Sequence, residues 1–524
     1  MTEEATSLKD YSKFKLLPLG HEKRSELIEQ WLLIGENQLT IQEEVLLAEV
    51  KLRFDEIDAL IGNRLMPSYP IFILTLLQSL EENLQNFSQT SYANIYLVLI
   101  KAGLIKEGIK DNVLTSLLNI LKELAFYLYN DLKSNSFKRS DFEIFITEYS
   151  KKYFRHQKLT TDRILDVLCK SNILKFDDEY YSFSYKYIYY FLIAQKISSE
   201  IEKYQELIYE LCNKIHLEVN ANILIFLSHH SKAQILIDNI VLTSEIPFEK
   251  FTPLNLNKDD EFVKFIAEFT DEIKHEIIDE INPKEEVKKD LKKKDSIERK
   301  SKIIEKDDDD ENALPPEALE MSQAFRTVKI IGQIVKNQSG DFEKEKLIKL
   351  VEAAYNTIFR FLGFYSEILV KDKDLLIEAI VENIKEKENK KRQGEIDVKL
   401  VEKSVKKMLQ FISWRICVDS ITNLMFSVGT KGQNELFEKV NLNIDSTASK
   451  LVTFAIKTFY DRIDTKELSQ LFDDVKDNYL AQCILREYIK RYLYTNFVER
   501  SKRDQIIHIA GFNKQRLVGK MKTN

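Results

Sequence analysis

The sequence predicts a mainly α-helical protein with one small β-hairpin, built as a helical domain, a winged helix and an irregular, repeat-like array of helices. Two observations predict this fold class. Apolar residues recur with a helical period along most of the chain, and turn formers are scarce, with 13 glycines and 8 prolines in 524 residues. Residues 173–183 depart clearly from the helical period. A chain of this length should contain several domains.

The departure from helical periodicity predicts a winged helix. Two short apolar runs, residues 173–176 and 180–183, flank the acidic turn at 177–179, which is typical of a β-hairpin. Residues 161–170 ahead of the hairpin have the pattern of an amphipathic helix. The helix expected after it, over residues 185–194, is apolar on nearly all sides and should therefore be buried.

The segment before the winged helix predicts a short strand and a helical domain. Residues 1–19 contain one apolar run, at 14–19, that is typical of a strand and would need a sheet to join. Residues 20–90 have helical periods, and Pro70 stands at the first turn of one of these helices, a position that suits proline. The winged-helix domain is then expected over residues 91–200.

The second half of the chain predicts a linker between two helical parts. Residues 201–281 continue the helical series as a helical linker domain. Residues 282–317 have opposed charge runs and little apolar periodicity, which predicts a disordered, flexible charged linker. Residues 318–524 predict a C-terminal helical interaction domain like an irregular α-solenoid.

The composition indicates which binding partners and which cellular compartment to expect. The net charge of −7 argues against a general binder of nucleic acid or membrane surfaces. The four cysteines lie far apart in apolar helical contexts, which favours buried, reduced thiols. The first residues lack an apolar signal region, and the apolar runs are too short to cross a bilayer, so we expect a cytoplasmic protein without membrane contact.

No residue pattern predicts catalysis or metal binding. No glycines have the Gly-x-x-x-x-Gly-Lys-Ser/Thr spacing that cradles phosphate, and residues 471–474 resemble a Walker B strand only in a helical context. The adjacent His229 and His230 would point about 100° apart on a helix, which favours a cap or local hydrogen bond over a shared metal. We therefore predict no catalytic residues, no metal site and no ATP hydrolysis by this chain alone.

The predicted helix at residues 161–170 could read DNA only if it were basic. Its charged residues sum to zero, so DNA binding through it is not expected. The basic end at residues 502–522 leaves a nucleic-acid alternative open for the C-terminal part.

Several motifs together resemble one known family. They are Pro18-Leu19, Arg24, Leu27-Ile28 and Trp31, then residues 66–70 with 76–81, residues 182–194, residues 226–231 and residues 330–337. This order is similar to the C-terminal portion of bacterial STAND NTPases of the NACHT-like type. The resemblance extends through about residue 350. It covers only the C-terminal portion of these proteins, without their P-loop ATPase core.

The resemblance implies specific roles. The run at 14–19 would be the last strand of a missing NTPase sheet, and Pro70 would pack against adenine. Tyr185 stands where many relatives have a nucleotide-sensing histidine, and a tyrosine can still donate a hydrogen bond to phosphate. No cofactor is expected in this chain alone, and ATP with Mg²⁺ would bind only if a P-loop domain completed the site.

The resemblance implies a non-catalytic regulatory and sensor part of a STAND signalling or antiphage-defence protein. An upstream ATPase and effector region would bind residues 14–19 and 65–71, and a protein partner or phage protein would bind residues 318–524. An unpaired N-terminal edge would also allow the chain to form a homo-oligomer. The alternatives are a free-standing helical scaffold or adaptor without nucleotide control, and the remnant of a truncated STAND gene.

Overall fold

The computed structural model describes residues 16–34, 42–61, 66–85, 92–154, 156, 159–270, 273, 275–278, 281–304, 315–338, 340, 342–390 and 397–515. Helices dominate the chain and the strands are few and short, which confirms the predicted fold class of mainly α with a small β-hairpin. Within these ranges, no helix combines the length and the apolar character that crossing a membrane requires.

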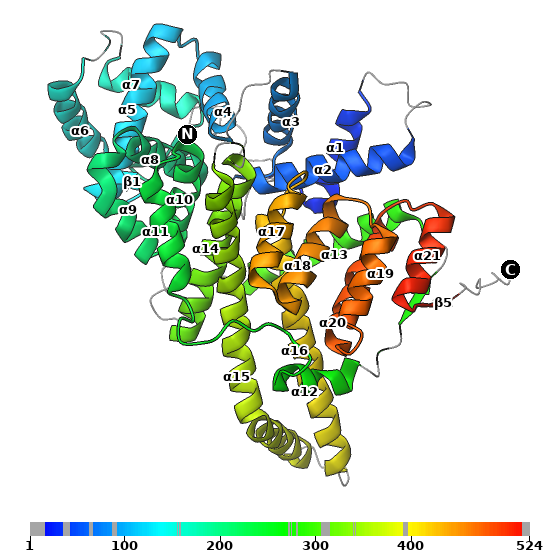
Figure 1. The fold of residues 1–524 in the computed structure, drawn as a ribbon. Coiled ribbons are helices and arrows are strands. Elements are labelled where there is room, and N and C mark those ends of the chain that lie inside the picture. Colours follow the sequence, from blue (N-terminus) through cyan, green and yellow to red (C-terminus); the bar gives the residue numbers. More distant parts are fainter. Residues whose placement is uncertain are drawn as a thin grey trace.

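The first half of the chain is a series of helices, most of which lie on the left and along the top in Figure 1. It comprises α1 (His21–Leu32), α2 (Glu43–Ile61), α3 (Pro70–Gln85), α4 (Tyr92–Lys106), α5 (Asp111–Asn130), α6 (Arg139–Lys152), α7 (Thr161–Lys170), α8 (Lys186–Ser199), the 3₁₀ helix η2 (Ile201–Tyr204), α9 (Gln205–Asn213), α10 (Glu218–His230), α11 (Gln234–Glu245) and α12 (Glu261–Thr270).

A three-stranded antiparallel sheet contacts α7 and α8. Its order is β1 (Ser136–Phe137), β3 (Tyr180–Phe183), β2 (Leu174–Asp177). The hairpin between β2 and β3 is confirmed, and Asp178 (φ 44°) and Glu179 (φ 71°) form its tight turn in the left-handed region. Strand β1 was not predicted, because two residues leave no detectable alternation.

Helix α8 is buried as its sequence predicted. It packs between α5 and α10, and all residues from Tyr187 to Ala194 are buried. One cluster of buried apolar residues extends from Ile28 to Phe512. The helices on both sides of residue 317 therefore share one core.

The second half begins with β4 (Glu276–Ile278) and α13 (Pro283–Ile304) and continues as a packed array of helices (Figure 1). The array comprises α14 (Pro316–Gln338), α15 (Lys344–Lys390), α16 (Val398–Val428), α17 (Asn434–Ile444), α18 (Thr447–Tyr460), α19 (Thr465–Asp474), α20 (Tyr479–Thr495), α21 (Arg500–Ala510) and β5 (Asn513–Gln515). The far ends of α15 and α16 project from the body as an arm, and a small separate cluster of Ile377, Val381 and Val405 holds them together.

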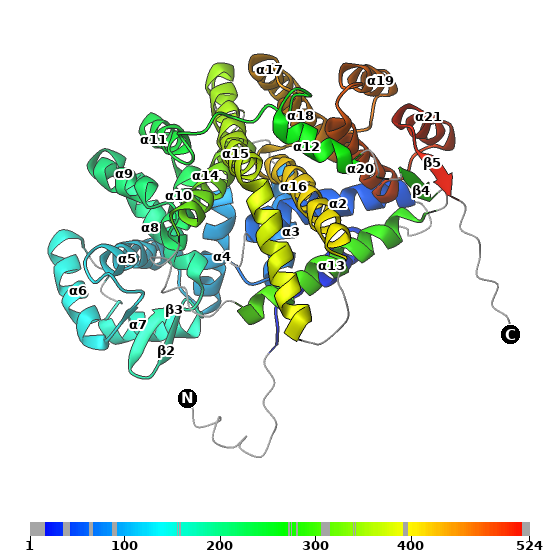
Figure 2. The ribbon, with the colours of Figure 1, turned by 90° about the horizontal axis from the view of Figure 1, so that it is seen from below.

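The prediction of a disordered linker is wrong for residues 283–304, which form α13 alongside the N-terminal helices (Figure 2). Several lysines of α13 form ion pairs with another helix. Three of them, four residues apart, pair in reverse order with glutamates of α1: Lys284 with Glu29 (2.6 Å), Lys288 with Glu26 (3.3 Å) and Lys292 with Glu22 (3.5 Å). Residues 305–314 of the predicted linker lie outside the described residues.

Helix α13 also caps the start of α1. Gly20 precedes α1 and has no side chain to cap it, but both Asp295 carboxylate oxygens accept backbone hydrogen bonds, from His21 (2.6 Å) and Glu22 (3.2 Å). A carboxylate at a helix N-terminus satisfies free N–H groups and interacts favourably with the helix dipole. The charged segment is thus a packed helix. Its packing could not be predicted locally, because its partners lie more than 250 residues away in the sequence.

The predicted N-terminal strand is not found in the part that the structure describes. Residues 16–20 have no regular secondary structure, and residues 14 and 15 lie outside the described residues. Leu19 is instead held by Ser68, which accepts a hydrogen bond from its N–H (2.9 Å) and donates one to its carbonyl (2.5 Å). The unpredicted strands β4 and β5 pair with each other in parallel.

Candidate functional site

The structure places Tyr185, one of the two residues that the family resemblance singled out, against α3, the helix that begins with the other, Pro70. Pro70 is the first residue of α3 and is exposed, whereas Tyr185 caps the start of α8 and is half-buried. The contact is made by Phe72 of α3, whose ring meets that of Tyr185 edge-on at a centroid distance of 5.4 Å. Tyr187 stacks on Tyr185 at 5.9 Å and fixes the other side of the ring.

The Tyr185 hydroxyl is a protonated donor at neutral pH. Burial raises the pKa of this hydroxyl, and the neighbouring Tyr69 raises it further. Among the described residues, no side chain or backbone group forms a hydrogen bond with it. A tyrosine hydroxyl in this state can donate a hydrogen bond to an anionic oxygen of a bound molecule.

Exposed apolar side chains adjoin this pair. Ile71 is 67% exposed directly after Pro70, and Leu16 and Leu17 are 86% and 78% exposed just before Leu19, which is bonded to Ser68. We call the group of Leu16, Leu17, Pro70, Ile71 and Tyr185 the α3 surface. Apolar groups gathered at one place on a surface are typical of a site for another protein or domain.

The two adjacent histidines are core residues of α10. His229 lies parallel to the ring of Tyr96 at a centroid distance of 6.4 Å, and its ring is close to Gln333 of α14. Burial lowers the pKa of His229 to about 3 and that of His230 to about 4, so both are neutral at pH 7. In the described ranges, no group of three or more His, Cys, Asp or Glu side chains is placed to hold a metal ion.

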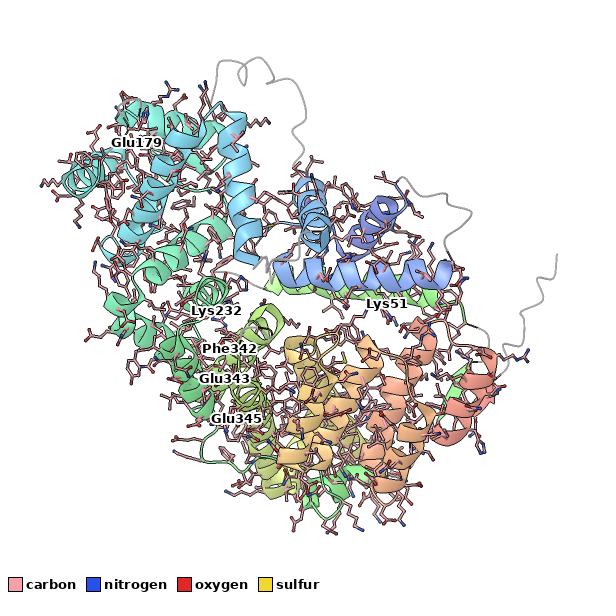
Figure 3. All side chains as sticks on the ribbon, turned by 45° about the horizontal axis from the view of Figure 1, so that its top comes forward. Lys51, Glu179, Lys232, Phe342, Glu343 and Glu345 are labelled. Atoms are coloured by element: carbon pink, nitrogen blue, oxygen red, sulfur yellow. The ribbon has the colours of Figure 1, made fainter. Side chains whose placement is uncertain are left out.

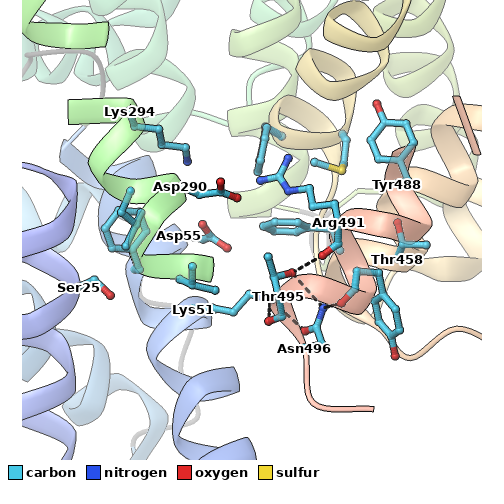
Figure 4. Close-up of a pocket in the computed structure, with 17 residues that line it drawn as sticks. Ser25, Lys51, Asp55, Asp290, Lys294, Thr458, Tyr488, Arg491, Thr495 and Asn496 are labelled. Atoms are coloured by element: carbon cyan, nitrogen blue, oxygen red, sulfur yellow. Dashed lines mark hydrogen bonds between the residues drawn. The ribbon is translucent and has the colours of Figure 1, made fainter. Parts of the chain in front are cut away.

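Sequence reasoning missed a cavity between the two halves of the chain. Its walls come from α1, α2, α13, α16, α18 and α20, and its charged residues include Lys51, Asp55, Lys294 and Arg491 (Figure 4). Figure 3 places Lys51 on the side of α2 that faces the C-terminal helices. No local motif marks this cavity, because residues from 25 to 496 contribute to it.

Comparison with known proteins gives one match. Residues 135–193 match the family described as Novel STAND NTPase 4. The matched segment contains β1, α6, α7, the hairpin and the first half of α8, and it therefore includes Tyr185. No curated protein and no solved structure was found to match the chain. Over this segment, the chain is similar to STAND NTPases.

Proposed function

We propose that this chain is the non-catalytic regulatory and sensor part of a STAND NTPase protein in signalling or antiphage defence, and that it works through protein contacts. One observation carries the proposal: the segment matched to a STAND family contains Tyr185, which packs on Phe72 of α3, the helix that begins with the exposed Pro70 and Ile71. The order α5, β1, α6, α7, β2, β3 is also the order of a winged helix, as the family resemblance requires.

The α3 surface is the proposed docking site for a P-loop NTPase region. Its apolar side chains would be buried in the contact, Pro70 would lie against the adenine, and the Tyr185 hydroxyl would donate to a phosphate oxygen. ATP and Mg²⁺ would then bind between the two parts, with the catalytic groups supplied by the P-loop region.

The arm formed by α15 and α16 is the proposed contact for a protein ligand. Apolar side chains are exposed along it: Leu375, Leu400, Met408 and Phe411 are between 45% and 66% exposed. Lysines and glutamates of both helices are interspersed with them, which favours a protein over nucleic acid. The same arm would serve a free-standing scaffold, so the α3 surface is what distinguishes the two functions.

A binding measurement tests the α3 surface. The partner is the P-loop NTPase region encoded next to this chain, in the same or a separate reading frame, purified and titrated with the chain in the presence of ADP. We expect Ile71→Asp to weaken binding at least about tenfold, because a carboxylate would be buried without a partner. Leu442→Asp is the matched control, since Leu442 on α17 is also 67% exposed and lies outside the α3 surface.

Two outcomes would contradict the proposal. Equal loss of affinity in both variants would show that the effect of the charge is not local to the α3 surface. Absence of binding by the unsubstituted chain, together with capture of a protein ligand by the arm alone, would favour the free-standing scaffold.

A further inference from the structure

Strand β2 (Leu174–Asp177) forms one edge of the three-stranded sheet. In the strand order β1-β3-β2, it has a neighbouring strand on one side only. The hairpin of β2 and β3 lies at the outer edge of the molecule (Figure 2). An unpaired strand edge presents backbone N–H and C=O groups to which another strand can pair. The edge of β2 is therefore a place where a further strand can join the sheet.

The hydrogen-bond pattern of the hairpin shows which backbone groups of β2 point outward. Asp177 pairs with Tyr180 across the two-residue turn. At the other end of the hairpin, Ser184 donates to the carbonyl of Ile173 at 2.9 Å. Hydrogen-bonded pairs recur at every second residue of an antiparallel ladder, so the odd-numbered residues of β2 turn their backbone groups toward β3. The N–H and C=O of Phe176 therefore point away from the sheet, and within the described ranges neither group forms a hydrogen bond.

The side chains of β2 are exposed beyond its first residue. Phe176 is 57% exposed, and its ring packs on one side against Tyr181 at a centroid distance of 4.6 Å. Lys175 and Asp177, the neighbours of Phe176 in the strand, are also exposed and carry opposite charges. Successive side chains of a strand alternate between the two faces of the sheet. The edge thus presents an aromatic ring on one face and a pair of opposite charges on the other.

This order of charges is complementary to itself. If two copies of β2 pair antiparallel about Phe176, the two Phe176 residues lie opposite each other, and Lys175 of each copy lies opposite Asp177 of the other. Side chains directly opposite have Cβ atoms about 4.5–5.5 Å apart, which is close enough for an ion pair. Moving the centre by one residue would place Lys175 opposite Lys175, or Asp177 opposite Asp177, and like charges directly opposite are destabilising. The charges therefore favour one register.

We propose that β2 pairs antiparallel with β2 of a second copy of this chain, centred on Phe176, so that two three-stranded sheets become one sheet of six strands. The outward N–H and C=O of Phe176 form the two central hydrogen bonds. The interface is isologous, because each contact occurs twice about a two-fold axis. It uses none of the residues of the α3 surface, so it does not rest on the proposed docking of an NTPase region.

The contact is small and should be reversible. Only residues 175–177 pair in each copy, because the turn begins at Asp178, which has a left-handed backbone conformation (φ 44°). Interfaces that bury less than about 1,200 Å² are typical of transient complexes. We therefore expect the dimer to form at high protein concentration and to dissociate on dilution.

Sedimentation velocity of the full chain tests the proposal. The chain is measured at concentrations from about 5 to 500 μM, the range in which a weak complex dissociates. We expect monomers at the low end and dimers at the high end. A chain that stays monomeric throughout would overturn the proposal and leave the edge of β2 to an extended segment of another protein.

Charge-reversing variants locate the contact. Lys175→Glu places a carboxylate opposite Asp177 of the other copy, and Asp177→Lys places an ammonium group opposite Lys175. Each substitution acts twice across the two-fold axis, so we expect each variant alone to dimerise at least about tenfold more weakly. When the two variants are mixed, opposite charges face each other again in both pairs. We therefore expect a heterodimer about as strong as the dimer of the unsubstituted chain.

Lys439→Glu on α17 is the matched control. Lys439 is exposed and lies outside the hairpin, and the substitution changes the net charge as much as Lys175→Glu does. We expect it to leave dimerisation unchanged. Unchanged dimerisation in both single variants of β2 would place the contact elsewhere and overturn the proposal. Failure of the mixed variants to form a heterodimer would overturn the register about Phe176.

Discussion

Replacing Phe226 with alanine should lower the free energy of unfolding by about 3–5 kcal/mol, the usual cost of removing a buried aromatic side chain. Phe226 is fully buried on α10. Its ring meets Tyr96 of α4 edge-on at 4.9 Å and Phe191 of α8 edge-on at 5.8 Å. The substitution would therefore open a cavity where three helices meet.

Urea denaturation followed by circular dichroism measures the effect of the Phe226 substitution. Tyr209→Ala is the control, since Tyr209 on α9 is 57% exposed, and it should change stability by less than about 0.5 kcal/mol. A loss below about 1 kcal/mol in Phe226→Ala would show that α10 is not packed as described.

Replacing Gly332 with alanine should destabilise the chain, although glycine to alanine usually stabilises a helix interior by about 1 kcal/mol. A Cβ atom at this position of α14 would lie 2.0 Å from the backbone carbonyl oxygen of Ser427 on α16. Lys336, one turn later, donates to the carbonyl of Phe426 at 2.5 Å, so the two helices are in close contact here. Separating them should cost about 1–3 kcal/mol or more, as in other overpacked cores.

Gly340→Ala provides the comparison for this close approach. No atom lies within 4 Å of a Cβ built at Gly340, so this substitution should leave the denaturation midpoint nearly unchanged. Equal or increased stability of Gly332→Ala would contradict the close packing of α14 on α16.

Local patterns predicted the helix and the β-hairpin between residues 161 and 183 well. The helix at residues 161–170 has the predicted bounds, and its inward residues are buried as expected, because its apolar period and the acidic turn of the hairpin are both local signals. The burial of α8 followed from a helix that is apolar on nearly all sides. Each of these features depends on residues close together in the sequence.

Long-range partners account for what the sequence could not predict. Helix α13 has too few apolar residues for an amphipathic pattern, and it is ordered by carboxylates of α1 and by the capping contact of Asp295. The cavity depends on Lys51, Lys294 and Arg491, which no spacing rule connects. Pro70 and Tyr185 were singled out through the family resemblance, and the contact of Tyr185 with Phe72 of α3 became visible only in the structure.

Amide hydrogen exchange tests the central claim most directly. The chain is measured alone and with the P-loop NTPase region and ADP, since exchange slows where a partner covers or stabilises the backbone. The account predicts slower exchange at the start of α3 and at the start of α8, with no change in α17 (Asn434–Ile444). Protection confined to the arm of α15 and α16, with none at α3 and α8, would contradict it.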